Sequence, residues 1–168
     1  KRLAALGLRE GRTQRTLTDI DYLLGVSDLT RQGALRLRLA SDTDAPVGPF
    51  VDPDTAVPKI IDLPRLLAAA DSVERDPDDQ TAIKNLLDAG SGSLGGAQPK
   101  ASVRDGERLL IAKFPHQDDA WDVMAWEATA LDLMEAAGIR TPERWLARVG
   151  ERSVLILRRF DRTGDGHR

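Results

Sequence analysis

The stretch "GSGSLGGAQPKASVRDGERLLIAKF", Gly90 to Phe114, decides the fold of this chain. It places a loop rich in glycine and serine directly before two short apolar runs. The runs are separated by Asp105-Gly106, a pair that favours a tight turn between antiparallel strands. The sequence therefore predicts a β-hairpin that is entered from a flexible loop, and Lys113 is the only charge in "LLIAKF".

Helices are predicted on both sides of this hairpin. Before it, "DLPRLLAAADSVE" carries Pro64 near its first turn, where a missing N–H costs little. "DDQTAIKNLLDAG" follows with acidic residues at its start and Gly90 at its end, as a helix favours. After the hairpin, "DDAWDVMAWEATALDLMEAAG" predicts one long helix capped by Asp118 or Asp119 and ended by Gly138. Its expected apolar stripe runs through Trp121, Met124, Ala128, Leu131 and Met134.

Further strands complete the expected fold. "RWLARVG" and "RSVLILRRF" predict two strands that join at Gly150-Glu151. Nearer the start, "LTDIDYLLGVSDL" predicts a helix stopped by Gly25. In "GALRLRLA", leucines at 35, 37 and 39 alternate with arginines, which predicts a half-buried strand. The predicted fold class is α+β, a small antiparallel sheet with one long helix.

Composition narrows the class of protein. The chain has 168 residues, 41 % of them hydrophobic, so it is able to bury a core. The net charge of −3 and the dispersed basic residues argue against a nucleic-acid surface. The absence of cysteine excludes disulfides and cysteine-based zinc sites. No apolar run reaches the roughly 18 residues of a membrane span, and no signal peptide opens the chain.

Three kinds of glycine-loop chemistry fit the loop differently. Gly90, Gly92 and Gly95 spell G-x-G-x-x-G, but a dinucleotide-binding fold needs a strand before that motif and a helix after it. Here the order is reversed. A P-loop needs G-K-[ST] entering a helix, and the chain has no such triplet. A kinase-type loop lies over nucleotide phosphates and is carried by strands, which agrees with the predicted order.

The other parts of a kinase nucleotide site follow in order. After the loop come Lys113 on a strand and Glu127 on the long helix, then a closing strand that leads to a hinge at Arg158 to Phe160. Each part alone has a plainer interpretation. The glycines also suit a surface linker, and both charges suit solvated positions. The ordered set favours the kinase interpretation over these.

"SLGGAQPKA", "IAKFP", "WEATALDLMEAAGI" and "LRRFDR" resemble the HipA family of bacterial toxin kinases, and "DYLLGVSDLTRQGALRLR" resembles the segment upstream in that family. The resemblance covers nearly the whole chain. It implies an ATP-dependent serine/threonine protein kinase of a type II toxin–antitoxin system, located in the cytoplasm. It also implies a protein substrate, an aminoacyl-tRNA synthetase in some members, and a helix-turn-helix antitoxin as partner, with DNA reached only through that antitoxin.

The resemblance carries particular roles to this chain. The hinge residues are Arg158, Arg159 and Phe160, whose backbone would hold adenine, although the family often has Glu at the place of Arg158. Lys113 would contact the ATP phosphates and Glu127 would pair with it. Ser93 matches a serine that is autophosphorylated in some members and switches the kinase off. The phosphate-covering loop corresponds to Gly95, Gly96, Ala97, Gln98, Pro99 and Lys100.

The family's catalytic aspartate and its Mg²⁺ ligands would lie beyond Arg168, and most of a small N-terminal subdomain before Lys1. We therefore expect an interior piece of such a kinase. Residues 1–90 are expected to hold a partial N-terminal subdomain, and 91–168 a kinase N-lobe-like, ATP-binding subdomain, inactive alone. The alternative is a catalytically inactive nucleotide- or partner-binding regulatory module of the same fold.

Two expectations concern other residue types. His116 and His167 lack metal-ligand spacing, so no metal site is predicted within the chain. The three tryptophans are expected in the core rather than at a cofactor: Trp121, Trp126 and Trp145.

Overall fold

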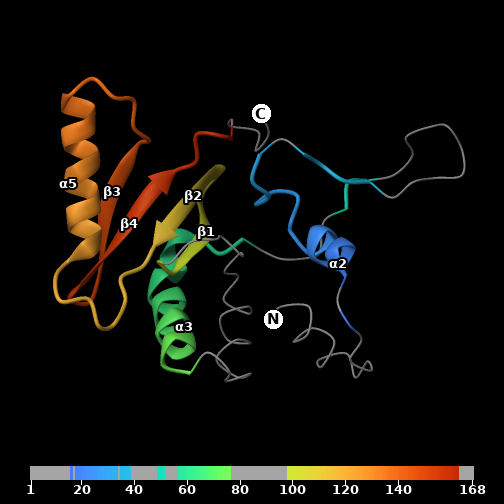
Figure 1. The fold of residues 1–168 in the computed structure, drawn as a ribbon, viewed down its shortest axis with the longest axis horizontal. Coiled ribbons are helices and arrows are strands. Elements are labelled where there is room, and N and C mark those ends of the chain that lie inside the picture. Colours follow the sequence, from blue (N-terminus) through green and yellow to red (C-terminus); the bar gives the residue numbers. More distant parts are fainter. Residues whose placement is uncertain are drawn as a thin grey trace, which may run out of the picture.

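A computed structural model describes residues 16, 18–33, 35–38, 49–51, 57–76 and 98–162, apart from the side chain of Tyr22. In this part of the chain the sheet has four antiparallel strands in the order β1-β2-β4-β3 (Figure 1). The strands are β1 (Lys100–Asp105), β2 (Arg108–Lys113), β3 (Arg144–Val149) and β4 (Arg152–Arg158). With its helices this is the predicted α+β class.

Two tight turns set the strand pairing. Gly106 and Gly150 have φ of 58° and 60°, a left-handed backbone that glycine adopts without strain. They join β1 to β2 and β3 to β4, as the sequence predicts. The first turn pairs Asp105 with Arg108, and this register carries back along the hairpin to Lys100 and Lys113.

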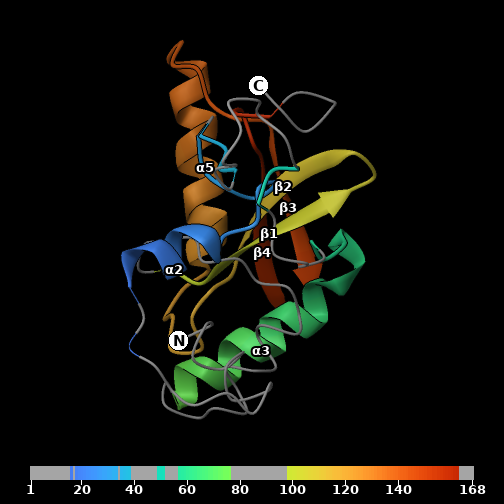
Figure 2. The same ribbon diagram turned by 90° about the vertical axis from the view of Figure 1, so that its right-hand side faces the viewer.

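Helices cover opposite faces of the sheet. The helix α3 (Leu63–Arg75) packs its leucines on one face, and α5 (Val123–Ala136) lies on the other, beside β3 and β4 (Figures 1 and 2). The alternation of side chains along each strand separates the two faces. Ala112 belongs to the α3 core, whereas its neighbour Lys113 contacts α5.

The hydrophobic core lies between α3 and the sheet. Its fully buried members include Leu66, Val103, Leu110, Val154 and Ile156. Since α3 precedes residue 90 and the sheet follows it, both sides of that predicted boundary contribute to one core. The division of the chain at residue 90 stays a prediction.

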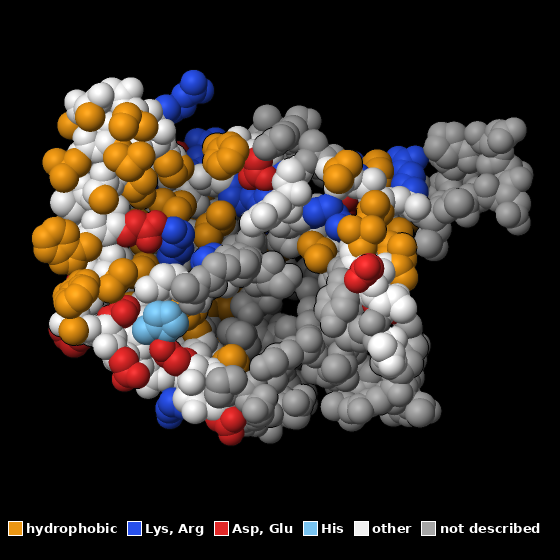
Figure 3. Space-filling view, viewed as in Figure 1, with side chains coloured by type: hydrophobic (Ala, Val, Ile, Leu, Met, Phe, Trp, Pro, Cys, Tyr) orange, Lys and Arg blue, Asp and Glu red, His pale blue; other side chains and the backbone are white. Residues whose placement is uncertain are grey.

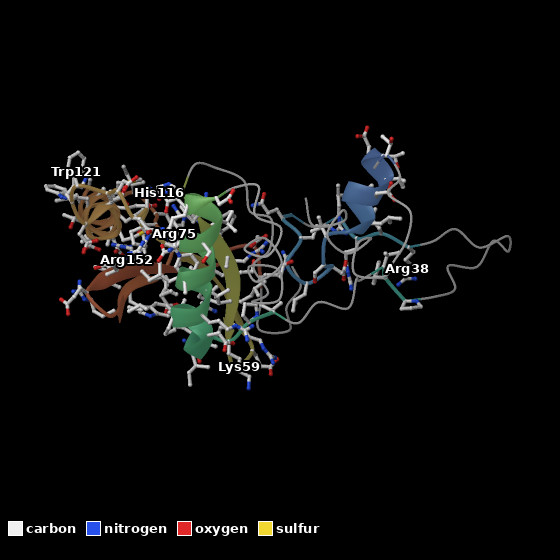
Figure 4. All side chains as sticks on the ribbon, turned by 90° about the horizontal axis from the view of Figure 1, so that it is seen from below. Arg38, Lys59, Arg75, His116, Trp121 and Arg152 are labelled. Atoms are coloured by element: carbon white, nitrogen blue, oxygen red, sulfur yellow. The ribbon has the colours of Figure 1, made fainter. Side chains whose placement is uncertain are left out.

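Polar contacts fix α3 at its carboxyl end. Arg152 of β4 binds both carboxylate oxygens of Asp71, at 2.9 and 2.8 Å. His116, in the loop after β2, pairs with Glu74. Figure 4 shows His116, Arg75 and Arg152 around this end of α3, with Lys59 at the other end. Lys59 precedes the 3-10 helix η1 (Ile60–Asp62). Its backbone forms an isolated β-bridge with Arg104, near the turn of the hairpin.

The long helix is shorter than predicted. It is capped by Asp122, whose carboxylate accepts the backbone N–H of Ala125 at 2.9 Å. Asp119 instead accepts the backbone N–H of His116 at 2.8 Å, and this turn precedes the helix. The prediction of a cap at Asp118 or Asp119 was therefore wrong. Gly138 follows the helix with φ of 82°, as expected.

The strand predicted at 35–39 is absent from residues 35–38, and Leu39 lies outside the described residues. The Val51 N–H donates to the Leu37 carbonyl at 2.7 Å, but no ladder of such bonds forms in the described part of this segment. Leu35 is 80 % exposed, while the guanidinium groups of Arg36 and Arg38 lie 3.4 and 4.0 Å from the centre of the Phe50 ring. Stacking on this ring, rather than strand pairing, explains the alternation.

Of two other predicted helices, the structure describes one. The early helix is α2 (Asp19–Leu24), which ends at Gly25 as predicted. The helix expected at 78–90 lies outside the described residues. Within the described residues, no helix is both long enough and apolar enough to cross a membrane.

Candidate functional site

Lys113 and Glu127 form an ion pair between the last residue of β2 and the second turn of α5. Both side chains are partly buried. Glu127 lies one helical turn after Met124, which is fully buried, so the acid is on the side of α5 that faces the sheet. The two charges that the sequence singled out, 14 residues apart, are therefore brought together.

Lys100 lies directly opposite Lys113 in the hairpin register, so both lysines are on the α5 side of the sheet. Like charges at opposing positions destabilise a sheet, and Glu127 offsets the charge of Lys113. Both lysines belong to the predicted site, but their pairing in register was not predicted. Counting back from the two-residue turn at Gly106 would have found it.

On the α5 face of the sheet, the row of side chains next to the two lysines is uncharged on β1, β2 and β4. Ser102, Ile111 and Leu157 pair in register across β1, β2 and β4. The Ser102 hydroxyl is buried without a hydrogen-bond partner within the described residues, and so is the Gln98 side-chain oxygen. Unpaired buried polar atoms are uncommon, because each costs about 1–3 kcal/mol. Ser102 lies on β1, and Gln98 lies two residues before that strand.

The predicted hinge follows directly from β4. The Arg158 N–H donates to the Glu143 carbonyl at 2.8 Å, and the Arg159 N–H donates to the Leu109 carbonyl at 3.2 Å. These two donors are therefore engaged within the protein. Phe160 is 89 % exposed, and within the described residues its own N–H has no partner.

A buried ion-pair cluster holds the hinge. Arg159 donates to both carboxylate oxygens of Asp161, at 2.8 and 2.6 Å, and to the carbonyls of Thr30 and Arg31. The hydrogen bonds from Arg159 lower the pKa of Asp161 from 3.8 to about 2, although burial opposes this. Arg162 adds a third bond to Asp161 at 3.0 Å. Arg159 is a predicted site residue, whereas its partner Asp161 was not predicted.

The Arg159 side chain is therefore occupied by structure. It is 2 % exposed and anchors the segment around Arg31 to the end of β4. Arg158 lies outside this cluster and pairs with Glu143 at 3.1 Å on the surface. Only backbone groups and the Phe160 ring remain open to a ligand at the hinge within the described residues.

The structure describes part of the predicted phosphate loop. Ser93, Gly95, Gly96 and Ala97 lie outside the described residues, whereas Gln98, Pro99 and Lys100 lie within them. The Pro99 carbonyl accepts the Phe114 N–H at 2.9 Å, which extends the hairpin by one bond toward the loop. Pro99 therefore leads into β1 beside Lys113.

Two predictions about the tryptophans were wrong. Trp121 and Trp126 are each 66 % exposed, while Trp145 packs against the core as expected. The long helix is apolar around most of its circumference, so its composition does not reveal which side packs. In the described part of the chain, no three His, Asp or Glu side chains gather as metal ligands.

Comparison with known proteins agrees with the resemblance. Residues 92–168 match the family model described as the HipA-like C-terminal domain. No curated protein and no solved structure matches the chain. The matched residues contain all four described strands and α5. The match supports a HipA-like family for the segment that carries the Lys113–Glu127 pair.

Proposed function

We propose that this chain is the ATP-binding part of a HipA-type serine/threonine protein kinase. The observation that carries the proposal is the ion pair between Lys113 on a strand and Glu127 on the adjacent helix. In protein kinases, a strand lysine is held by a helix glutamate and contacts the phosphates of ATP. The HipA-like match over residues 92–168 supports the same assignment.

The positive charges of two neighbouring lysines suit the phosphates of ATP. Lys100 and Lys113 are adjacent on one face, and the chain between Gly90 and Lys100 is rich in glycine. A triphosphate would offset the repulsion between the lysines, and backbone N–H groups of a glycine loop suit its oxygens. Mg²⁺, when bound, would neutralise charge on the phosphates, and we assign none of its protein ligands to the described residues.

The uncharged side chains next to the lysines suit the adenine base of ATP. Ile111 and Leu157 offer an uncharged surface on the same face as Lys113. The Phe160 N–H and the hinge carbonyls supply hydrogen-bonding groups at the end of β4, where adenine would lie.

The remaining parts of the proposal rest on the family resemblance. The substrate would be a protein, of the aminoacyl-tRNA synthetase class in some family members, and the partner a helix-turn-helix antitoxin. The 168 residues would bind ATP without transferring phosphate, because their one H-x-D triplet, His116-Gln117-Asp118, precedes α5 and has Val123 where a kinase catalytic loop has Asn. A radiolabelled ATP assay on the purified chain should show no incorporation above that of a Lys113→Met control.

Nucleotide binding tests the proposal directly. Titration calorimetry with ATP and Mg²⁺ should detect binding, and Lys113→Met should lower the affinity about 10- to 100-fold through loss of a charge-assisted bond. The matched control is Lys59→Met. Lys59 forms a backbone β-bridge with Arg104, at the end of β1 opposite to Lys100. Equal affinity in wild type and Lys113→Met would refute the site.

Two matched variants on α5 test the role of Glu127. Glu127→Gln should weaken ATP binding several-fold, because Lys113 loses the group that positions it. Glu135→Gln removes an acid from the same helix that pairs with Arg144 instead, at 2.8 Å, and should leave the affinity unchanged. Equal effects of both variants would show that Glu127 acts only through helix stability.

A further inference from the structure

The outer face of α5 carries an exposed apolar stripe. Trp126 and Leu133 are each 66 % exposed, and Ala130 and Ala137 are exposed between and beyond them. Figure 3 shows hydrophobic side chains gathered over α5. Large exposed apolar residues in one stripe are a feature of interaction surfaces rather than of ordinary monomer surfaces.

Helix geometry places these four residues in one line. At 3.6 residues per turn, positions 126, 130, 133 and 137 follow the spacing of one helical face. Glu127 and Met124 lie toward the sheet on the other side. The acids Asp132 and Glu135 are turned to Arg144 of β3. The outer stripe is therefore free of charge, and it is separate from the proposed ATP site.

Large and small residues alternate along the stripe in an order that is complementary to itself. If a second copy is laid antiparallel about a point between residues 131 and 132, Trp126 faces Ala137 of the other copy. Leu133 then faces Ala130. Each contact occurs twice because the two-fold axis repeats it. Bulky side chains meet small ones at every position, which lets two helices pack closely.

The charges at the helix ends fit the same arrangement. Asp118 and Asp122 lie at the amino end of α5, and Arg140 follows its carboxyl end. Figure 3 shows acidic side chains below the apolar patch, toward the amino end of α5. In the antiparallel arrangement, Arg140 of one copy comes beside the acidic end of the other, and the helix dipoles oppose. A parallel arrangement would place like charges together.

We propose that two copies of this chain associate through the outer face of α5, with their helices antiparallel. The contact leaves the face of α5 that bears Glu127 untouched. Dimerisation is therefore independent of ATP binding. An experiment that refutes dimerisation does not refute the proposed ATP site, and the reverse also holds.

Sedimentation of the whole 168-residue chain tests association. Across about 1 µM to 1 mM, the weight-average mass should rise from one chain toward two. Leu133→Glu should raise the dissociation constant about tenfold or more, because it buries a charge in the contact. The control is Ile61→Glu, the same change at an exposed residue on η1. A chain that stays monomeric over this range overturns the proposal, as does equal behaviour of the two variants.

Cross-linking tests the antiparallel register, since the natural chain has no cysteine. At a rise of 1.5 Å per residue and a close helix separation, the two Ala130 Cα atoms would lie about 6–7 Å apart. The two Ala137 Cα atoms would lie about 17 Å apart. Ala130→Cys should thus oxidise to a disulfide-linked dimer, and Ala137→Cys should remain largely unlinked. Linking of both variants, or of neither, overturns the antiparallel arrangement, and retained circular dichroism confirms that each variant is folded.

Discussion

Asp161→Asn removes the negative charge from a buried cluster while keeping the shape of the side chain. Arg159 would lose a carboxylate that it binds through two hydrogen bonds, at 2.8 and 2.6 Å. It would keep the carbonyls of Thr30 and Arg31. Leaving a buried charge without its partner commonly costs about 3–5 kcal/mol, and the two retained carbonyls place this change near the lower end.

The pKa of Asp161 gives an independent magnitude. It is lowered from 3.8 to about 2, and each pKa unit corresponds to about 1.4 kcal/mol, so the charged form contributes about 2 kcal/mol of folding stability. Because the pKa is lower in the folded state, this stability is fully present above pH 3.8. It is lost as the pH falls from there toward 2.

Urea unfolding at several pH values is the assay. The free energy of unfolding of Asp161→Asn should lie about 2–3 kcal/mol below that of the wild type at pH 7, and the difference should shrink toward pH 2. Asp132→Asn is the control, because Asp132 pairs with Arg144 from a side chain that is 69 % exposed. It should cost less than about 1 kcal/mol. A difference for Asp161→Asn that is absent at pH 7, or constant down to pH 2, would refute the reasoning.

Two other substitutions test separate parts of the structure. Asp122→Ala removes the cap of α5 and the acceptor for the Ser153 hydroxyl, so thermal unfolding should show a loss of about 1–2 kcal/mol, against less than about 0.5 for Asp118→Ala. Equal losses would contradict the capping role. Ser93→Asp should weaken ATP binding by adding charge to the loop expected over the phosphates, as phosphoserine does with about −1.5 to −2 charges. Ser93→Ala should bind ATP like the wild type. Phosphopeptide mass spectrometry on the active form of the proposed kinase should find Ser93 modified. An unmodified loop peptide with a fully binding Ser93→Asp would remove this regulatory role.

Local signals in the sequence predicted the local structure. Asp105-Gly106 marks the hairpin turn, and Gly138 marks the end of the long helix, because each pattern needs only neighbouring residues to act. The order of loop, strand lysine and helix acid also predicted that Lys113 and Glu127 would meet. Contacts within one strand–helix unit are thus accessible from spacing.

Contacts between distant segments were not accessible in this way. Arg159 binds the carbonyl of Thr30 across 129 positions, and no periodicity reveals such a partner. The alternation at residues 35–38 predicted a strand, but strand formation depends on a neighbour that alternation does not identify. Trp126 was expected in the core because it is large and apolar, yet α5 has apolar residues on both faces and only one packs on the sheet.

Polar side chains tie α5 to the sheet at three positions along its length. The Asp122 carboxylate accepts the Ser153 hydroxyl at the amino end, and Glu127 binds Lys113 near the middle. Arg144 binds Asp132 and Glu135 toward the carboxyl end. If an anion binds Lys113 while Glu127 holds the lysine, all three contacts remain. The helix then stays where it is, because both of its ends and its middle remain tied to the sheet. Binding of an anion at Lys113 is therefore a side-chain event, and it requires no displacement of the helix as a rigid body.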